Sequence, residues 1–181
     1  NTSGSSNTGV GEQALIVNTT GTMNAAFGFR ALDANTSGGG NTGLGDEAAS
    51  SVTTGDNNTM VGKKTGFALQ TGSYNIGIGS FALDAATTTS SLTAVGYQAL
   101  TTNTGAENTG IGYRALKSST TGVQNTAIGF DVMYYNTTGS GNTAVGMQAL
   151  DANTTGGQNT ALGNTALSAN TTASANMAIG R

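Results

Sequence analysis

A glycine that follows an apolar residue recurs every seventeen residues along this 181-residue chain. The spacing changes once, where sixteen residues separate Gly96 from Gly112. A repeat this short and constant is too small for a helical hairpin, which needs roughly thirty residues or more, and it fits one coil of a solenoid. The glycines that mark the repeat, which we expect to form turns, are Gly11, Gly28, Gly45, Gly62, Gly79, Gly96, Gly112, Gly129, Gly146, Gly163 and Gly180.

The consensus of the repeat, numbered from its asparagine as positions 1 to 17, reads N-T-A-V-G-x-x-A-L-x-x-N-T-T-G-x-x, and residues 142–158 are a clean copy. Its glycines and threonine-rich stretches leave no segment long enough for a stable helix. Short strands joined by glycine and asparagine turns remain. We therefore predict an all-β fold, a parallel β-roll or β-solenoid with one coil per 17-residue repeat, forming a single array of about ten coils over residues 1–181.

Variation among the copies indicates which way each position faces. Position 4 is always apolar, so we predict that it points into the core together with position 2, which alternation places on the same strand face. Position 3, mostly glycine or alanine, would then face outward and admit a neighbouring backbone. Positions 6 and 7 vary in the manner of a solvent face, and Ala-Leu at positions 8 and 9 supplies a second apolar anchor. The predicted core ladder at position 4 is Val10, Phe27, Leu44, Val61, Ile78, Val95, Ile111, Ile128, Val145, Leu162 and Ile179.

Asparagine begins ten of the eleven copies, and Leu92 is the exception. In stacked coils these side chains would form a ladder in which each amide donates to the next. The alternative is that they are only turn residues at the entry to each strand. The predicted ladder comprises Asn7, Asn24, Asn41, Asn58, Asn75, Asn108, Asn125, Asn142, Asn159 and Asn176.

The Asn-Thr-Thr-Gly segment at positions 12 to 15 is expected to form a tight corner, with asparagine and glycine taking positive φ. The one-residue deletion falls in this segment, at residues 103–105. A corner tolerates such a loss, whereas a strand would shift its register.

The core of such a coil is thin. Burying two large apolar side chains contributes roughly 2 kcal/mol each, whereas ordering the backbone costs about 1 to 2 kcal/mol per residue. Association with other copies would supply part of the difference. We therefore expect a homo-oligomer, a trimer in contact through position 3, and a segment of a longer fibre.

The pattern G-x-N-T-A-V-G-x-x-A-L-x-x-N-T-T-G resembles repeats of phage tail fibre proteins and related fibrous surface proteins, over the whole chain. Residues 125–129, NTAIG, and 177–180, MAIG, are also similar to the S-V-A-I-G core of the heads of trimeric autotransporter adhesins. This resemblance implies a trimeric, left-handed β-roll on a virion tail fibre or at a cell surface. Coils of the adhesin heads are shorter and more variable in length than these.

The residue types present favour a structural protein over an enzyme. The chain has no histidine or cysteine, which removes the common general bases, nucleophile partners and zinc ligands, and we expect no cofactor and no metal. Six basic and nine acidic residues, without a basic cluster or a long apolar run, argue against nucleic-acid partners and membrane insertion. Tyr134 and Tyr135 could form a stacking platform for a receptor or glycan.

Three functions fit this repeat. The first is the shaft or adhesive rod of a phage tail fibre or cell-surface appendage, which presents a receptor-binding tip. The second is a subunit of a self-assembling extracellular filament. The third is an ice-binding β-solenoid, in which regular threonines order water; the predicted burial of position 2 argues against it.

Overall fold

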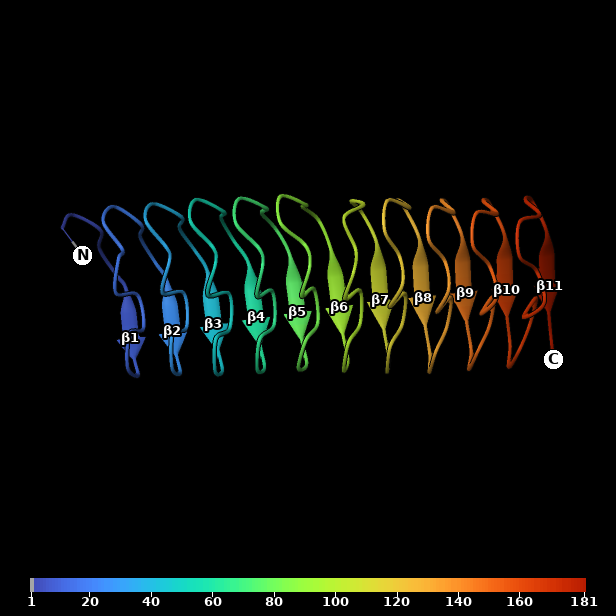
Figure 1. The fold of residues 1–181 in the computed structure, drawn as a ribbon, viewed down its shortest axis with the longest axis horizontal. Coiled ribbons are helices and arrows are strands. Elements are labelled where there is room, and N and C mark those ends of the chain that lie inside the picture. The colour runs from blue at the N-terminus through green and yellow to red at the C-terminus, as the bar shows by residue number, and fades with distance from the viewer. Residues whose placement is uncertain (1) are drawn as a thin grey trace.

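The computed structural model describes residues 2–181 and is a rod of stacked coils (Figure 1). Each coil contributes one three-residue strand to a single eleven-stranded sheet, in which strands adjacent in sequence pair in parallel. The predicted all-β solenoid with one coil per repeat is confirmed. The strands are β1 Thr8–Val10, β2 Ala25–Phe27, β3 Thr42–Leu44, β4 Thr59–Val61, β5 Ile76–Ile78, β6 Thr93–Val95, β7 Thr109–Ile111, β8 Thr126–Ile128, β9 Thr143–Val145, β10 Thr160–Leu162 and β11 Met177–Ile179.

The sheet keeps its register along the whole rod. We number the coils from coil 1, residues 7–23, to coil 10, residues 159–175; the sixteen-residue coil 6 covers residues 92–107. Thr8 pairs with Ala25 across seventeen residues, and Thr93 pairs with Thr109 across sixteen. The missing residue of coil 6 therefore comes out of the corner and leaves the strand pairing unchanged.

The strands face the opposite way from the prediction. Position 3 is buried, as at Ala94 and Ala127, whereas position 4 faces outward, and Leu44 and Ile128 expose 47% and 38% of their surface. The predicted core ladder is therefore wrong, and so is the outward contact at position 3. The reason is the narrow interior: a Cβ built on Gly43 would lie 3.1 Å from Leu32 Cγ, so only a small residue normally fits there.

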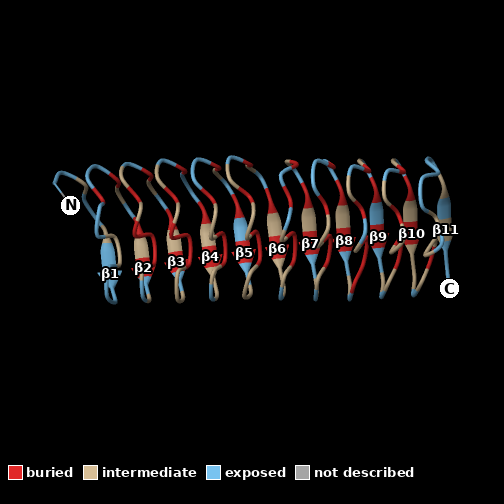
Figure 2. Cartoon of the chain, in the orientation of Figure 1, coloured by how far each residue is buried: buried red, intermediate tan, exposed pale blue. Residues whose placement is uncertain are grey.

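Alanine and leucine make up most of the actual core. Position 8 is fully buried in residues such as Ala31 and Ala99, and position 9 in Leu32, Leu83 and Leu100. Figure 2 shows buried segments recurring at matching places in successive coils. The core is a continuous ladder of small and medium side chains rather than a layer of large ones.

The turns adopt positive φ at positions that differ in part from the prediction. The marker glycines at position 5 have φ between 120° and 144°, and a Cβ on Gly28 would lie 2.3 Å from Gly45 O. Positions 7, 9 and 17 also have positive φ, as at Gln13, Leu15 and Met23, whereas the asparagine and glycine of the corner do not. The corner glycine is needed for space instead, because it lies against the carbonyl of the next coil.

The asparagines of position 1 form a hydrogen-bonded ladder inside the rod. The backbone N–H of Asn58 donates to Asn41 Oδ1 at 2.9 Å, and Asn58 Nδ2 donates to the same oxygen at 3.0 Å and to Gly72 O at 2.9 Å. The same pattern recurs at Asn125 and Asn159. Each amide thus holds the coil before it and closes its own corner.

A second asparagine ladder occupies position 12. Asn153 Nδ2 donates to Asn136 Oδ1 at 2.7 Å and to Gly156 O at 2.9 Å, the carbonyl that Asn142 Nδ2 also reaches. Both ladders therefore converge on the carbonyl of position 15. The sequence predicts only a turn at these residues, whereas their burial in the structure shows a role in the core.

Candidate functional site

The outward face of the sheet is a regular surface that runs along the rod. Each strand directs positions 2 and 4 outward, and none of the eleven strands contains a charged residue. Position 4 supplies valine, isoleucine, leucine or phenylalanine in every strand, and eight strands begin with threonine. The result is an uncharged, largely apolar stripe that follows the whole length of the rod, which we call the sheet face.

Aromatic residues stack along positions 6 and 7 of coils 5 to 8. The rings of Tyr97 and Tyr113 lie 5.5 Å apart, and those of Tyr113 and Phe130 lie 5.1 Å apart with an angle of 8° between planes. Phe81 meets Tyr97 edge to face at 6.2 Å. Since the coils hold these side chains in register, the repeat converts single exposed aromatic residues into a continuous stack.

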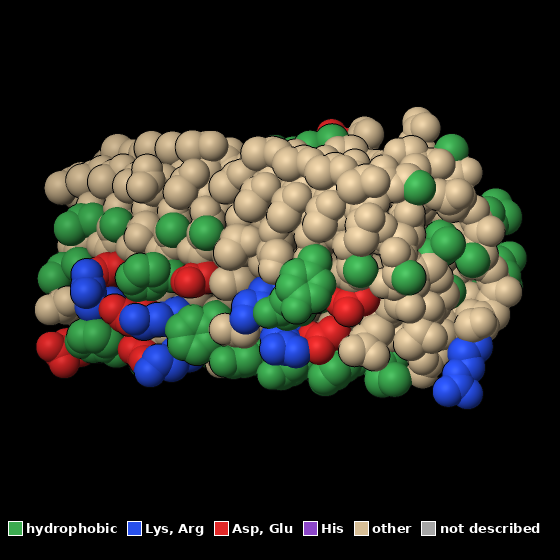
Figure 3. All heavy atoms as spheres, turned by 45° about the vertical axis from the view of Figure 1, so that its right-hand side comes forward, with side chains coloured by type: hydrophobic (Ala, Val, Ile, Leu, Met, Phe, Trp, Pro, Cys, Tyr) green, Lys and Arg blue, Asp and Glu red, His purple; other side chains and the backbone are tan. Residues whose placement is uncertain are grey.

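Charged residues also pair between coils at positions 6 and 7, which form one edge of the rod. Lys63 Nζ lies 3.2 Å from Asp46 Oδ2, and Lys64 Nζ lies 3.2 Å from Glu47 Oε2. Figure 3 shows the charged side chains gathered along the lower part of the rod, while the upper part consists mainly of backbone and uncharged polar groups. Exposed pairs of this kind contribute little to stability but order the side chains of this edge.

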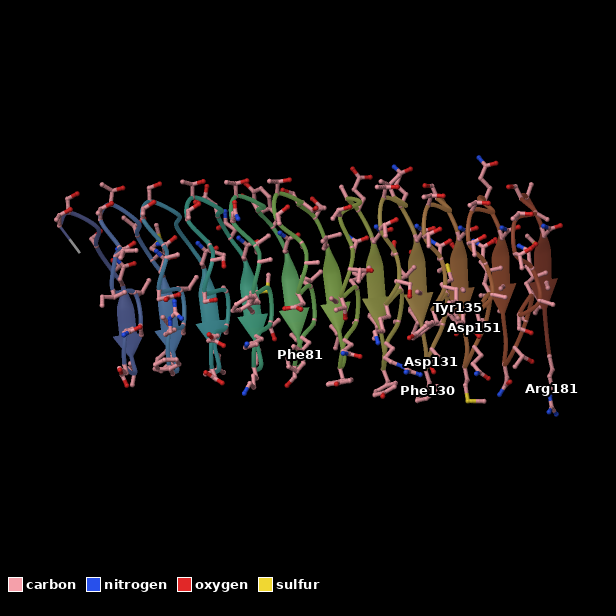
Figure 4. All side chains as sticks on the ribbon, viewed as in Figure 1. Phe81, Phe130, Asp131, Tyr135, Asp151 and Arg181 are labelled. Carbon is pink, nitrogen blue, oxygen red and sulfur yellow. The ribbon has the colours of Figure 1, made fainter. Side chains whose placement is uncertain are left out.

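A pocket of about 270 Å³ lies where coils 7, 8 and 9 meet this edge. Arg114 donates from Nε and Nη2 to the two carboxylate oxygens of Asp131, at 2.8 and 2.5 Å, and this pairing raises the pKa of Arg114. Burial raises the pKa of Asp151, and the nearby Asp131 charge adds to that effect. Figure 4 places Tyr135, Asp131 and Asp151 close together on this part of the rod.

The structure therefore brings the predicted residues together in three groups. The asparagine ladder lies inside the rod, the marker glycines stack at the turn after each strand, and the position 4 residues form the sheet face. Tyr134 and Tyr135 meet edge to face at 4.7 Å and line the pocket with Arg114, Asp131 and Asp151. This convergence could not be predicted from the sequence, because the five residues belong to three different repeats.

Within residues 2–181, no group of three acidic side chains is placed to hold a metal ion, and no helix is long and apolar enough to cross a membrane. The chain was also compared with protein-family models, curated proteins and solved structures. None of the three comparisons yields a match.

Proposed function

We propose that this chain is the structural shaft of a fibre, an adhesive rod of a phage tail fibre or cell-surface appendage that presents a receptor-binding tip. The observation that carries the proposal is the sheet face, which repeats without a charge along the rod. A chain that only needed to be soluble would gain from polar residues at position 4, where every strand instead has a large apolar residue.

The occupant that best fits the sheet face is another copy of the same chain. Side chains on this face repeat once per coil, at about the 4.8 Å strand spacing, and only a partner with the same repeat can match them over many coils. An identical rod meets this condition because it has the same repeat spacing. Three such rods around one axis would cover the three faces together, and we propose this trimer as the assembled form.

Covering the face also makes a thin solenoid more stable. Leu44, Ile78 and Ile128 each leave 38 to 47% of their surface open in the single chain. Burial of such side chains yields about 25 cal/mol per Å² of apolar surface, and the gain is repeated in every coil. A homotrimeric rod would therefore be stiffer and harder to unfold than a single one, as a shaft requires.

Native mass measurement on the purified chain tests this proposal. We expect a particle of three times the 17.8 kDa chain mass. Replacing Ile111 and Ile128 with aspartate should return it to a monomer, because six charges cannot be buried at one interface. The matched control, Thr138→Asp on an exposed corner, should stay trimeric. A wild-type chain that is monomeric at high concentration would contradict the proposal.

An ice-binding solenoid is the second candidate, and the outward threonines favour it. Position 2 was predicted to be buried with the core, which counted against ice binding, whereas the structure places it on the sheet face beside position 4. Ice binding requires this face to be open, and trimer formation covers it. Thermal hysteresis in a monomeric sample would therefore support this alternative against the shaft, and its absence in a trimeric sample would support the shaft.

The proposed filament differs from the shaft in the direction of assembly. Filament growth would join rods end to end through the open edges of the sheet, so mass would increase with concentration without reaching a fixed value. A discrete trimer excludes this outcome. Mass measured over a dilution series distinguishes the two.

A further inference from the structure

The pocket of coils 7 to 9 has features that the repeat does not account for. It is lined by Arg114, Asp131, Tyr134, Tyr135, Gln148 and Asp151. Coil 8 is the only one of the ten coils with aromatic residues at both positions 10 and 11; the matching pair in coil 9 is Asp151 and Ala152. The two tyrosines are therefore a local departure from the consensus, at the same place as the pocket.

The two tyrosines differ in what covers them. The guanidinium carbon of Arg114 lies 4.9 Å from the centre of the Tyr134 ring, and Lys117 Nζ lies 5.6 Å from it. Tyr135 contacts the Tyr134 ring edge to face and exposes 54% of its surface. Tyr134 therefore acts as a fixed support, and Tyr135 offers a flat ring to a ligand.

The polar groups of the pocket are held in place by the coils. Arg114 and Asp131 come from neighbouring coils and bind each other through two hydrogen bonds, which neutralises both charges. The backbone N–H of Tyr135 donates to the backbone carbonyl of Asp151 at 3.2 Å, which fixes the two coils against each other at this point. Burial raises the pKa of the Asp151 carboxyl group, and the nearby Asp131 charge adds to that effect. Asp151 and Gln148 thus bring a carboxylate and an amide to the rim of a pocket whose arginine is already paired.

We propose that this pocket binds an uncharged saccharide, with one sugar ring stacked on Tyr135 and its hydroxyl groups bonded to Asp151 and Gln148. A pyranose ring has an apolar C–H face that packs on an aromatic ring, and its hydroxyl edge matches planar carboxylate and amide groups. The volume of about 270 Å³ is at the small end for ligand pockets, which suits one sugar unit of a longer glycan.

The charges select against acidic sugars. Arg114 is the one basic residue of the pocket lining, and Asp131 occupies it, while Asp151 adds a negative charge. A carboxylated or sulfated sugar would meet that charge, while the arginine of the lining is already paired and Lys117 lies over the Tyr134 ring, outside the lining. The site therefore extends the proposed shaft by giving it its own adhesive contact, and none of its residues belongs to the sheet face.

A glycan array that carries neutral hexose, N-acetylhexosamine, amino-sugar and sialylated oligosaccharides tests this site with the full 181-residue chain. We expect binding to one or more neutral glycans and none to the sialylated set. On the strongest neutral glycan, Tyr135→Ala and Asp151→Asn should each weaken binding about tenfold, measured by titration calorimetry.

Tyr74→Ala is the matched control, because Tyr74 is 66% exposed and lies on coil 4, away from the pocket. Its affinity should equal that of the wild type, and thermal melting should show all three variants folded. Absence of binding to every neutral glycan, a preference for sialylated or amino-sugar glycans, or an equal loss in Tyr74→Ala would each overturn the proposal. The mass measurement on the shaft is independent of these outcomes.

Discussion

Coils 3 to 5 and coils 8 to 10 close the same corner by different means. In coils 8 to 10 position 12 is asparagine, and Asn136, Asn153 and Asn170 continue the second amide ladder. In coils 3 to 5 the same position is Val52, Leu69 and Ala86, all fully buried. We call the corner of coils 8 to 10 the amide corner and the corner of coils 3 to 5 the apolar corner.

The backbone of the coil therefore has the same register whether position 12 is an asparagine or an apolar residue. The strands pair in the same register in both regions. Buried polar atoms lose their hydrogen-bond partners where the asparagine ladder of position 12 stops, because each amide needs a partner in the next coil. Asn35 Oδ1 lies below Val52 and is buried without a hydrogen bond, and so is Ser119 Oγ, which stands between Asn103 and Asn136.

Coil 6 shows how one such boundary is resolved. Leu92 cannot accept at position 1, so Asn108 Nδ2 donates instead to Asn103 Oδ1 at 3.0 Å, within its neighbour's corner. The shortened corner that contains Asn103 makes this contact possible. The single exception in the first ladder and the single deletion in the chain are thus adjacent in the fold.

The largest expected effect lies in coil 4, one of the coils with an apolar corner, at Met60 in strand β4. This side chain is buried at position 3 and fills the space left by Gly66, which replaces the usual leucine of position 9 in the same coil. A Cβ on Gly66 would lie 2.8 Å from Met60 Sδ. Met60→Ala should lower the free energy of unfolding by about 3 kcal/mol, because the cavity cannot be filled from either side. Urea denaturation measures the change.

The compensating exchange Met60→Ala with Gly66→Leu restores the consensus and should recover most of that loss. Leucine tolerates the positive φ of position 9, as Leu83 and Leu100 do. Gly66→Leu alone should destabilise, because the new side chain would meet Met60. If the double variant is no more stable than Met60→Ala, the two residues do not compensate each other.

The next effect is on the amide corner, at Asn142. Its Oδ1 accepts from the backbone N–H and the side-chain amide of Asn159, at 2.9 and 3.1 Å, and its own amide donates to Gly156 O. Asn142→Ala would leave buried donors without an acceptor and should cost about 2 to 3 kcal/mol. Asn164→Ala, an exposed asparagine of the following coil, should change the unfolding energy by less than about 0.5 kcal/mol. Equal losses would remove the ladder as the explanation.

A smaller gain is expected where the second asparagine ladder is interrupted. Ser119→Asn would supply the missing member between Asn103 and Asn136 and should stabilise by about 1 kcal/mol. Val52→Asn should destabilise, although it offers Asn35 a partner, because its own amide would be buried under Leu69. Thermal melting of both variants gives the comparison, and a gain in both would show that apolar neighbours do not matter.

The period, the parallel stacking and the position of each strand could be predicted from the sequence, since the glycine spacing and the apolar residue before it mark every coil. Which face of each strand points into the core could not be predicted from the sequence. Alternation separates Ala127 from Thr126 and Ile128 but does not say which side is inside, and hydrophobicity alone favours isoleucine. The decisive quantity is the width of the coil, which Leu32 and Leu100 already fill.

The candidate site was predictable only in part. Tyr134 and Tyr135 stand out as adjacent aromatic residues, and the sequence indicates a stacking platform for a receptor or glycan there. Their polar partners Arg114 and Asp151 lie twenty and sixteen residues from Tyr134 and Tyr135, at consensus positions that vary freely. Only the seventeen-residue stacking places them on one pocket.

The smallest expected effect concerns Asp84, which occupies position 10 in the apolar region as Asp151 does in the amide region. Burial raises the pKa of Asp84, and Lys64 partly offsets this. A carboxyl group with a raised pKa in the folded state is less stable when charged, so its cost is present at neutral pH and disappears as the pH falls through that pKa toward the ordinary value of 3.8. Asp84→Asn should therefore raise the melting temperature slightly at pH 7 and leave it unchanged near pH 3. A lower melting temperature at pH 7 would show that attraction to Lys64 outweighs burial at this position.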